Sequence, residues 1–213
     1  MKSLIKIKGD ASFRKFFRKN KVNYSSIVVF AKKEKIKNLL VYDAINKILI
    51  KNKILAPNLY KENYRKNYIE IQDFGNETIY KKLNKNRNNK FNYFKKIIDL
   101  LIKIQSIKNK NIKNFKNKIY KIPKYNKKIL IEEANLFCDW YVSKYPSKLS
   151  KDKFSKEFKK IIKYLTQNLK LKNIFFVHRD FHVSNLMLVN NQLGVIDSQD
   201  ALIGNRAYDL ASL

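Results

Sequence analysis

The first 75 residues contain several short runs of alternating apolar and polar positions and one longer helical pattern. Residues 4–8 alternate apolar and basic side chains, as a half-buried strand does, and residues 13–18 can return antiparallel to them after a Gly-Asp-Ala-Ser turn signal. Two further apolar runs, 26–31 and 68–72, also predict strands. Residues 35–51 carry Ile, Leu and Ala at helical spacing, which predicts an amphipathic helix beside the sheet.

The middle of the chain has a mostly helical pattern. Residues 91–107 are amphipathic, and further helices are expected at 128–144 and 153–171. The Lys/Asn-rich segment 108–126 is weakly patterned and is expected to have little order. Asp73-Phe74-Gly75 interrupts the pattern before these helices and is a candidate hinge.

The last part of the chain returns to short strands, at 174–177, 186–189 and 193–196. Asn190-Asn191 predicts a hairpin turn between the second and third of these strands. Strands, then helices, then a short hairpin predict an α+β fold. We expect a small, mainly β N-terminal lobe over residues 1–75 and a larger, mainly helical C-terminal lobe over 76–213.

Composition narrows the class of protein. Its 213 residues are 45% hydrophobic and 13% aromatic, which excludes a disordered basic tail. No apolar run approaches the ~18 residues of a membrane span, and the first ten residues have no secretory signal. The single cysteine, Cys138, suits a reducing compartment. These features predict a cytoplasmic globular protein that does not cross a membrane.

The net charge of +30, from 47 basic and 17 acidic residues, has two interpretations. It is typical of nucleic-acid binding, or it reflects genomic base composition, because Lys, Asn and Ile have codons rich in A and T while arginine occurs at only six positions. The charge is unevenly distributed. Residues 173–213 contain no lysine, and their two arginines and four aspartates give a net charge of −2. We therefore expect the chemistry of the protein in this stretch.

Three residues of the lysine-free stretch have the spacing of a phosphoryl-transfer site. Asp180 follows His178 by two residues, Asn185 follows Asp180 by five, and Asp197 ends the next apolar run. This order matches the kinase H-x-D-x-x-x-x-N loop and the metal-binding aspartate after it. Phosphoryl transfer needs a carboxylate to orient the attacking hydroxyl and oxygen ligands for Mg²⁺. Asp180 fits the first role, and Asn185 with Asp197 fits the second. A turn capped by Asp180 and Asn185 is the structural alternative.

The loop at 178–185 resembles the catalytic loop of aminoglycoside phosphotransferases and choline kinase-like enzymes. Residues 9–18, 135–142, 177–188 and 194–210 resemble more closely the bacterial kinases that phosphorylate the anomeric hydroxyl of N-acetylmuramate and N-acetylglucosamine during cell-wall recycling. The resemblance implies a protein kinase-like two-lobed fold, ATP and Mg²⁺, and a small sugar as acceptor. An aminoglycoside or a choline-like alcohol is the alternative acceptor.

The resemblance also implies roles for individual residues. Asp180 would be the catalytic base, with Asn185 and Asp197 as Mg²⁺ ligands. The hinge at 71–75 would meet adenine through its backbone. The implied nucleotide-binding residues are Asp10, Ala11, Ser12, Phe13, Gln72 and Asp73, and the implied supporting residues of the catalytic loop are His178, His182 and Asp209.

Four further residues are candidates for contact with the sugar. Glu133 and Trp140 lie seven residues apart, which is two turns along one face of a regular helix, and a carboxylate with an aromatic ring suits a sugar. Core packing is the alternative for Trp140. Gln199 and Asp200 match the family, and Asp200 has a loop cap as its alternative role.

The sequence departs from the kinase pattern in three places. The strand at 27–31 lacks the phosphate-binding lysine that protein kinases carry there, although Lys32 and Lys33 follow it directly. Ser198 stands where an aromatic residue usually follows the metal-binding aspartate. The chain stops at Leu213 in what resembles the first turn of a helix, so we expect the C-terminal lobe to be incomplete.

A different class of function stays open at this point. A basic binding module on a degenerate kinase-like fold would use the +32 charge of the first 172 residues, with Tyr and Phe among the lysines, to hold RNA. Nucleic acid is therefore a less favoured partner than a small sugar, and the oligomeric state is not indicated.

Overall fold

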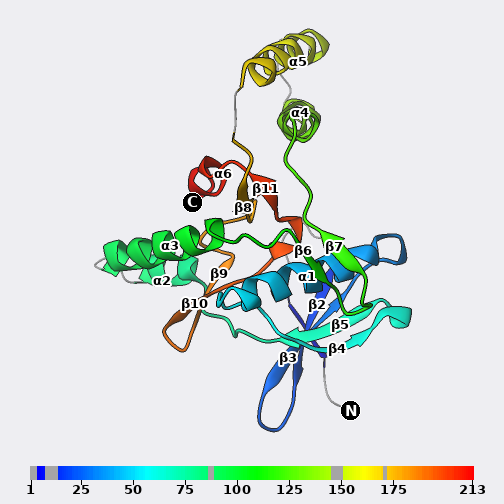
Figure 1. Ribbon diagram of the computed structural model, residues 1–213, viewed down its shortest axis with the longest axis vertical. Coiled ribbons are helices and arrows are strands. Elements are labelled where there is room, and N and C mark those ends of the chain that lie inside the picture. The colour runs from blue at the N-terminus through cyan, green and yellow to red at the C-terminus, as the bar shows by residue number, and fades with distance from the viewer. Residues whose placement is uncertain (1–3, 8–13, 86–88, 145–150, 170–171) are drawn as a thin grey trace.

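The computed structural model describes residues 4–7, 14–85, 89–144, 151–169 and 172–213. A five-stranded sheet lies at one end of the molecule, and helices and short strand pairs make up the middle (Figure 1). Two helices, α4 (Lys127–Leu136) and α5 (Lys151–Asn168), stand apart at the other end. Among the described residues, no helix is both long and apolar enough to cross a membrane.

The sheet is antiparallel throughout and has the spatial order β1-β2-β3-β5-β4. Its strands are β1 (Leu4–Ile7), β2 (Lys15–Asn20), β3 (Ser25–Phe30), β4 (Leu59–Asn63) and β5 (Tyr68–Gln72). The sequence predicted four of these five. It did not predict β4, because this edge strand is largely exposed and needs no regular apolar face.

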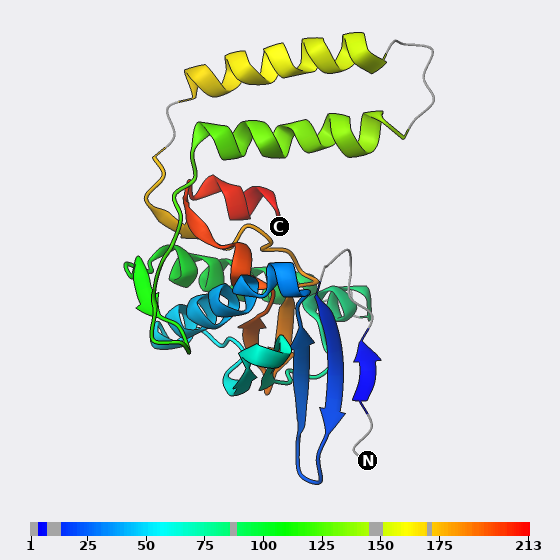
Figure 2. The ribbon, with the colours of Figure 1, turned by 90° about the vertical axis from the view of Figure 1, so that its right-hand side faces the viewer.

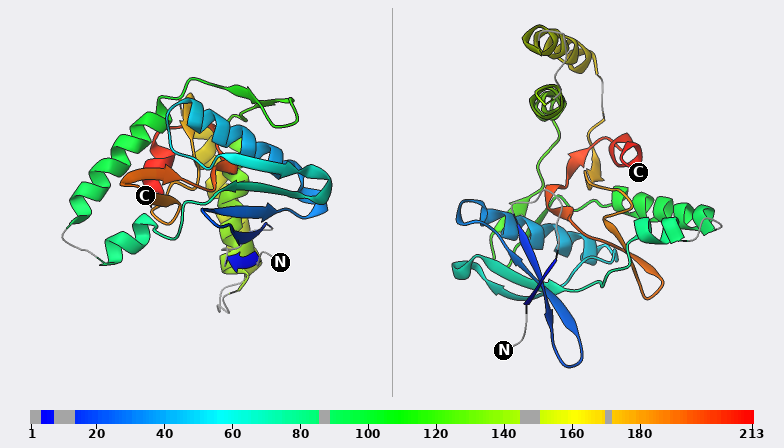
Figure 3. Two further views of the ribbon diagram at one scale, coloured as in Figure 1. Left: turned by 90° about the horizontal axis from the view of Figure 1, so that it is seen from below. Right: turned by 180° about the vertical axis from the view of Figure 1, so that it is seen from behind.

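Helix α1 (Lys37–Lys51) lies across one face of the sheet (Figure 3). Leu39 and Tyr42 of α1 pack against Val29 of β3 and Ile69 of β5. Apolar positions at helical spacing along α1 are buried against apolar positions of the strands, which is how the sequence specifies this layer.

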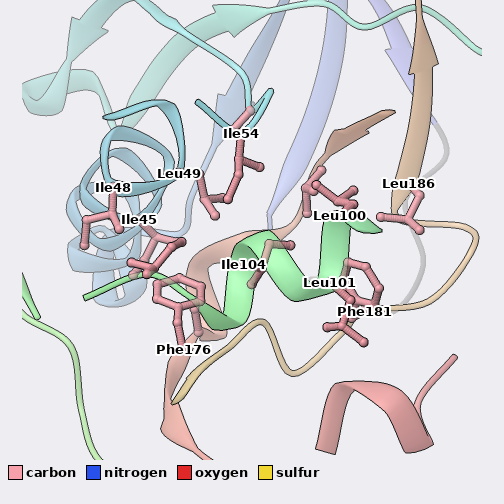
Figure 4. Packing of buried hydrophobic residues seen from close by; sticks show 14 of the residues in the cluster. Ile45, Ile48, Leu49, Ile54, Leu100, Leu101, Ile104, Phe176, Phe181 and Leu186 are labelled. Carbon is pink, nitrogen blue, oxygen red and sulfur yellow. The ribbon is translucent and has the colours of Figure 1, made fainter. Parts of the chain in front are cut away.

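The other side of α1 joins the main core. Ile45 and Ile48 of α1 belong to one buried cluster with Ile104 of α3 (Lys90–Gln105) and with Phe176 and Phe181 of the C-terminal segment (Figure 4). This cluster joins elements from both sides of residue 75. The lobe boundary at that residue therefore stays a prediction.

Residues 108–126 are more ordered than expected, so that prediction is wrong. β6 (Asn111–Lys113) and β7 (Ile119–Lys121) form an antiparallel hairpin. Its turn contains Asn117 in the left-handed region, at φ 56°, and the buried Asn114 side chain accepts bonds from two backbone amides. Tertiary packing of a few apolar side chains against the main core stabilises strands too short to produce a sequence pattern.

The predicted helix at 128–144 is α4 (Lys127–Leu136) followed by a π-helical turn (Phe137–Val142). With α5 (Lys151–Asn168) it forms a helix pair that stands off the rest of the molecule (Figure 2). Trp140 lies in the π-helical turn and is 65% exposed, so it does not pack in the core.

The C-terminal segment forms two short strand pairs, and the predicted hairpin is confirmed. β8 (Phe175–Val177) pairs with β11 (Leu202–Gly204), and β9 (Leu186–Val189) pairs with β10 (Gln192–Val195). Asn190 and Asn191 make the hairpin turn at φ 46° and 63°, which asparagine tolerates better than most residues. A short helix, α2 (Ile79–Lys85), precedes α3, and α6 (Ala207–Ala211) follows β11.

Candidate active site

The segment between β8 and β9 carries the predicted catalytic loop. The backbone N–H of His182 and the side-chain amide of Asn185 both donate to the carbonyl oxygen of Asp180, each at 3.0 Å. The N–H of Asn185 donates to the carbonyl of His182 at 2.9 Å. At the five-residue spacing of the motif, these local bonds close the loop on itself.

Asp197 is brought to the same place by the end of β10. The backbone N–H of Ile196 donates to the carbonyl of Asn185 at 3.1 Å, so Asn185 and Asp197 lie side by side. Asp197 itself has φ 61°, a left-handed conformation that costs about 1–3 kcal/mol for residues other than glycine. Arg179, directly before Asp180, has φ 75°. Strained backbone at both positions is typical of a functional site.

Asp209 holds the start of the catalytic loop from the last helix. Its buried carboxylate accepts the backbone N–H groups of His178, at 2.8 Å, and of Arg179, at 2.9 Å. Burial raises the pKa of Asp209 to about 6, and the two amide donors offset part of this effect. Burial also lowers the pKa of His178 to about 4, so its imidazole is neutral at physiological pH.

A cavity of about 280 Å³ connects the sheet with the catalytic segment. Its lining includes Asn185 and Asp197 on one side and Ile27, Gln72 and Asp73 on the other. Burial, and then the negative charges of Asp197 and Asp200, raise the pKa of Asp180. The site therefore combines the Asp180 carboxyl group, whose pKa is raised, with the side-chain oxygens of Asn185 and Asp197 at the wall of the cavity.

The hinge residues border this cavity and are tightly held. Arg18 of β2 donates two bonds to the carboxylate of Asp73, at 2.5 and 3.0 Å, and Ser25 donates a third at 2.7 Å. Burial acts to raise the pKa of Asp73, but the bonds from Arg18 and Ser25 hold it below its ordinary value. The backbone N–H groups of Gln72 and Gly75 already donate within the protein, to Asn58 and Asp73.

Arg14 belongs to this site, although the sequence had not singled it out. Its guanidinium donates to Oδ1 of Asp197 at 2.6 Å and to Oε1 of Gln199 at 2.5 Å. Gln199 in turn donates to Asp200 at 2.7 Å. Gln199, a candidate for sugar contact, is therefore 5% exposed and bonded to groups of the protein. An arginine directly before β2, in a chain that mostly uses lysine, was the signal available in the sequence.

The unusual Ser198 has a clear partner in the structure. Its hydroxyl donates to the side-chain oxygen of Asn46 in α1 at 2.7 Å, and both residues are buried. Asn46 donates onward to the carbonyl of Pro57 at 3.1 Å. A hydrogen bond therefore links the turn at Asp197 to α1 where kinases usually have an aromatic side chain.

Glu133 and Trp140 are not brought together. Glu133 makes an ion pair with Arg179 and accepts hydrogen bonds from Tyr125 and Tyr208, so it fixes α4 against the catalytic loop. Trp140 lies outward, with the ammonium of Lys144 5.2 Å from its ring. The prediction that Glu133 and Trp140 share a face assumed a regular α-helix. The π-helical turn at Phe137–Val142 has more residues per turn, so Trp140 is rotated away from the face of Glu133.

The remaining predicted residues divide into two groups. His182 contacts the amide of Asn185 through its ring at 3.2 Å, as expected for a loop support, and Asp200 is exposed beside Gln199. The expected nucleotide-covering turn, Asp10, Ala11, Ser12 and Phe13, lies outside the described residues.

The comparisons with known proteins agree with this geometry. Residues 3–213 match the phosphotransferase enzyme family, and the chain belongs to that family. It is similar to N-acetylmuramate/N-acetylglucosamine kinases of Pseudomonas aeruginosa (27% identity, 99% of this chain and 59% of the relative) and Neisseria meningitidis serogroup B (26%, 96% and 58%). The chain thus spans less than two thirds of these relatives.

The fold comparison extends to solved structures. A ternary complex of the aminoglycoside phosphotransferase APH(2″)-IIa with streptomycin and ATP has a TM-score of 0.66 at 16% identity, over 97% of this chain and 69% of that one. The predicted α+β, kinase-like architecture is confirmed.

Proposed function

We propose that the protein transfers the γ-phosphoryl group of ATP to the anomeric hydroxyl of an N-acetylated amino sugar. The observation that carries this proposal is that Asn185 and Asp197 line one cavity while Asp180 is hydrogen-bonded to Asn185 and close enough to Asp197 to interact with its charge. Membership of the phosphotransferase family supports the reaction class, and the names of the curated relatives support the amino sugar.

Asp180 would act on the acceptor. Its carboxylate accepts a hydrogen bond from the attacking hydroxyl, orients it towards the γ-phosphorus, and takes its proton as the new O–P bond forms. The bond to the oxygen bridging the β- and γ-phosphorus atoms breaks, and ADP leaves. A pKa raised by burial and neighbouring carboxylates favours a base that can accept the proton.

Asn185 and Asp197 fit a magnesium ion. The amide nitrogen of Asn185 is committed to Asp180, so the oxygen is the end of this side chain that can bind a cation. Asp197 has a carboxylate oxygen already facing a positive group, Arg14. Carboxylate and amide oxygens are hard ligands that suit Mg²⁺, which takes its other ligands from phosphates and water. When bound, the ion would offset charge on the phosphates.

The state of Glu133 favours an acceptor without a positive charge over an aminoglycoside or a choline-like cation. A cationic acceptor is best held by unpaired carboxylates. Glu133 of α4 is instead paired with Arg179 of the loop at 178–185, and it accepts hydrogen bonds from Tyr125 and Tyr208.

The test is a phosphate-transfer assay over N-acetylmuramate, N-acetylglucosamine, choline and aminoglycosides. We expect transfer to an N-acetylated sugar, and a fall in kcat of about 10²- to 10⁴-fold in Asp180→Asn. ADP binding should change little in this variant. Asp99→Asn, which removes an exposed aspartate of α3, is the matched control and should keep full activity. Full activity of Asp180→Asn would contradict the proposed role.

A further inference from the structure

The strand β3 has no basic side chain for a nucleotide phosphate. Ile27 of β3 lines the cavity, and Val29 is buried in the core. Lys32, beyond the end of β3, is exposed and lines a separate hollow with Lys15 and Phe17. Lys15 and Phe17 alternate along β2 with Phe16, which packs towards α1, so they lie on the opposite face of the sheet.

Arg14, directly before the neighbouring strand β2, brings a basic group to Asp197 instead. Phe16 of β2 pairs with Val29 of β3, and Arg14 lies directly before β2, with its guanidinium beside the rings of Phe16 and of Tyr42 in α1. Its side chain is 4% exposed. The guanidinium carbon lies 5.5 Å from the ring centre of Phe16 and 5.8 Å from that of Tyr42. Two aromatic rings therefore hold the orientation of this group.

The partners of Arg14 direct it towards the metal-binding carboxylate. Asp197 accepts one bond, and Gln199, itself bonded to Asp200, accepts another. A guanidinium is a planar fork whose geometry matches phosphate oxygens, and it keeps its charge when buried. Nucleotide phosphates that share a cation with Asp197 must come within reach of the same fork.

We propose that Arg14 is the residue that binds the nucleotide phosphates, in place of the β3 lysine of protein kinases. This inference rests on the proposed use of ATP. Asp197, which lines the cavity, and Gln199 hold the buried guanidinium in place behind it, and the phosphates become additional acceptors when the nucleotide binds. Arg18 of β2 lines the cavity and is bonded to Asp73, so its side chain is already engaged by the protein.

The test compares ADP with adenosine, which differ only in the phosphates. Dissociation constants are measured by calorimetry with Mg²⁺ present, for the wild-type protein and for Arg14→Gln, Arg18→Gln and Lys15→Gln. We expect Arg14→Gln to weaken ADP about 10- to 100-fold, the range of a charge-assisted hydrogen bond, and adenosine less than about 3-fold. Arg18→Gln should weaken both ligands equally, and Lys15→Gln should weaken neither.

Two outcomes would overturn the inference, and a third would refute the proposed function on which it rests. Equal weakening of ADP and adenosine by Arg14→Gln would make Arg14 a structural anchor only. Tighter ADP binding would mean that Arg14 competes for Asp197. A wild-type protein that binds neither ADP nor adenosine would instead refute the proposed function, and this result is distinguishable from the other two.

A second measurement does not depend on the folding of a variant. The wild-type chain has only six arginines, so its side-chain Nε–H NMR signals are few. The Arg14 signal should shift on addition of Mg²⁺ and ADP and stay unchanged with Mg²⁺ and adenosine. An unchanged signal with ADP would overturn the inference.

Discussion

The hydrogen bond between Ser198 and Asn46 should couple α1 to the turn that presents Asp197. The two residues are 152 positions apart, and the Ser198 hydroxyl and the Asn46 side-chain oxygen are 2.7 Å apart in a buried setting. Ser198→Ala removes the donor and leaves the Asn46 oxygen unpaired. Asn46→Ala leaves both the Ser198 hydroxyl and the Pro57 carbonyl without this partner.

The expected magnitudes follow from these partners. An unpaired buried acceptor costs about 1–3 kcal/mol, so Ser198→Ala should lower the free energy of unfolding by about 2 kcal/mol. For a domain of this size that corresponds to a fall in Tm of roughly 4–8 °C. Asn46→Ala should cost more. In the double variant the two losses overlap, and we expect a coupling energy of about 1 kcal/mol.

The assay is urea unfolding of the wild type, the two single variants and the double variant. Ser106→Ala is the matched control, because its hydroxyl makes a similar bond, to Lys103, but in an exposed position. Its effect should stay within about 0.5 kcal/mol. Additive single effects, with coupling below about 0.3 kcal/mol, would refute the claim that this bond joins α1 to the Asp197 turn.

Two further predictions concern charge. His178 has a pKa of about 4 in the folded protein, so between pH 6.5 and 4 the unfolded state binds its proton more strongly and acidification lowers stability. Asp209 has a folded pKa of about 6, so over almost the same window the folded state binds its proton more strongly and acidification raises stability. Each contributes roughly 3 kcal/mol and they oppose each other, so urea midpoints between pH 7 and 4.5 should fall more steeply on acidification in Asp209→Asn than in the wild type, and less steeply in His178→Gln. Parallel pH profiles for all three proteins would contradict this assignment. Mixed RNA should bind weakly and lose binding near physiological salt if the +30 charge reflects genomic base composition, and tight binding in a filter assay at that salt would support the RNA-binding alternative.

Local spacing was enough to predict that residues 178–185 form one loop. Asp180 and Asn185 are five residues apart and are joined by a hydrogen bond within the loop, so their relation does not depend on distant parts of the chain. The hairpin turn at Asn190-Asn191 and the amphipathic helix α1 are predictable for the same reason, because their signals lie within a short window.

Several elements had no such signal. The edge strand β4 is largely exposed, and the β6–β7 hairpin is stabilised by a few contacts with a distant core. Glu133 has the residue type of a sugar ligand, yet its position beside Arg179 and Tyr208 gives it structural partners. A residue type alone does not specify which neighbour will use it.

The sequence by itself was enough to predict the phosphotransferase family, because the evidence was the type and spacing of Asp180, Asn185 and Asp197 along one short stretch. Only the tertiary structure decided what surrounds them. Arg14 reaches Asp197 across 183 positions, and no local pattern encodes a contact between segments that meet only when the sheet packs on the catalytic segment. The lysines that dominate the charge are common to most of the chain, whereas the buried arginine beside Asp197 is held there by long-range packing.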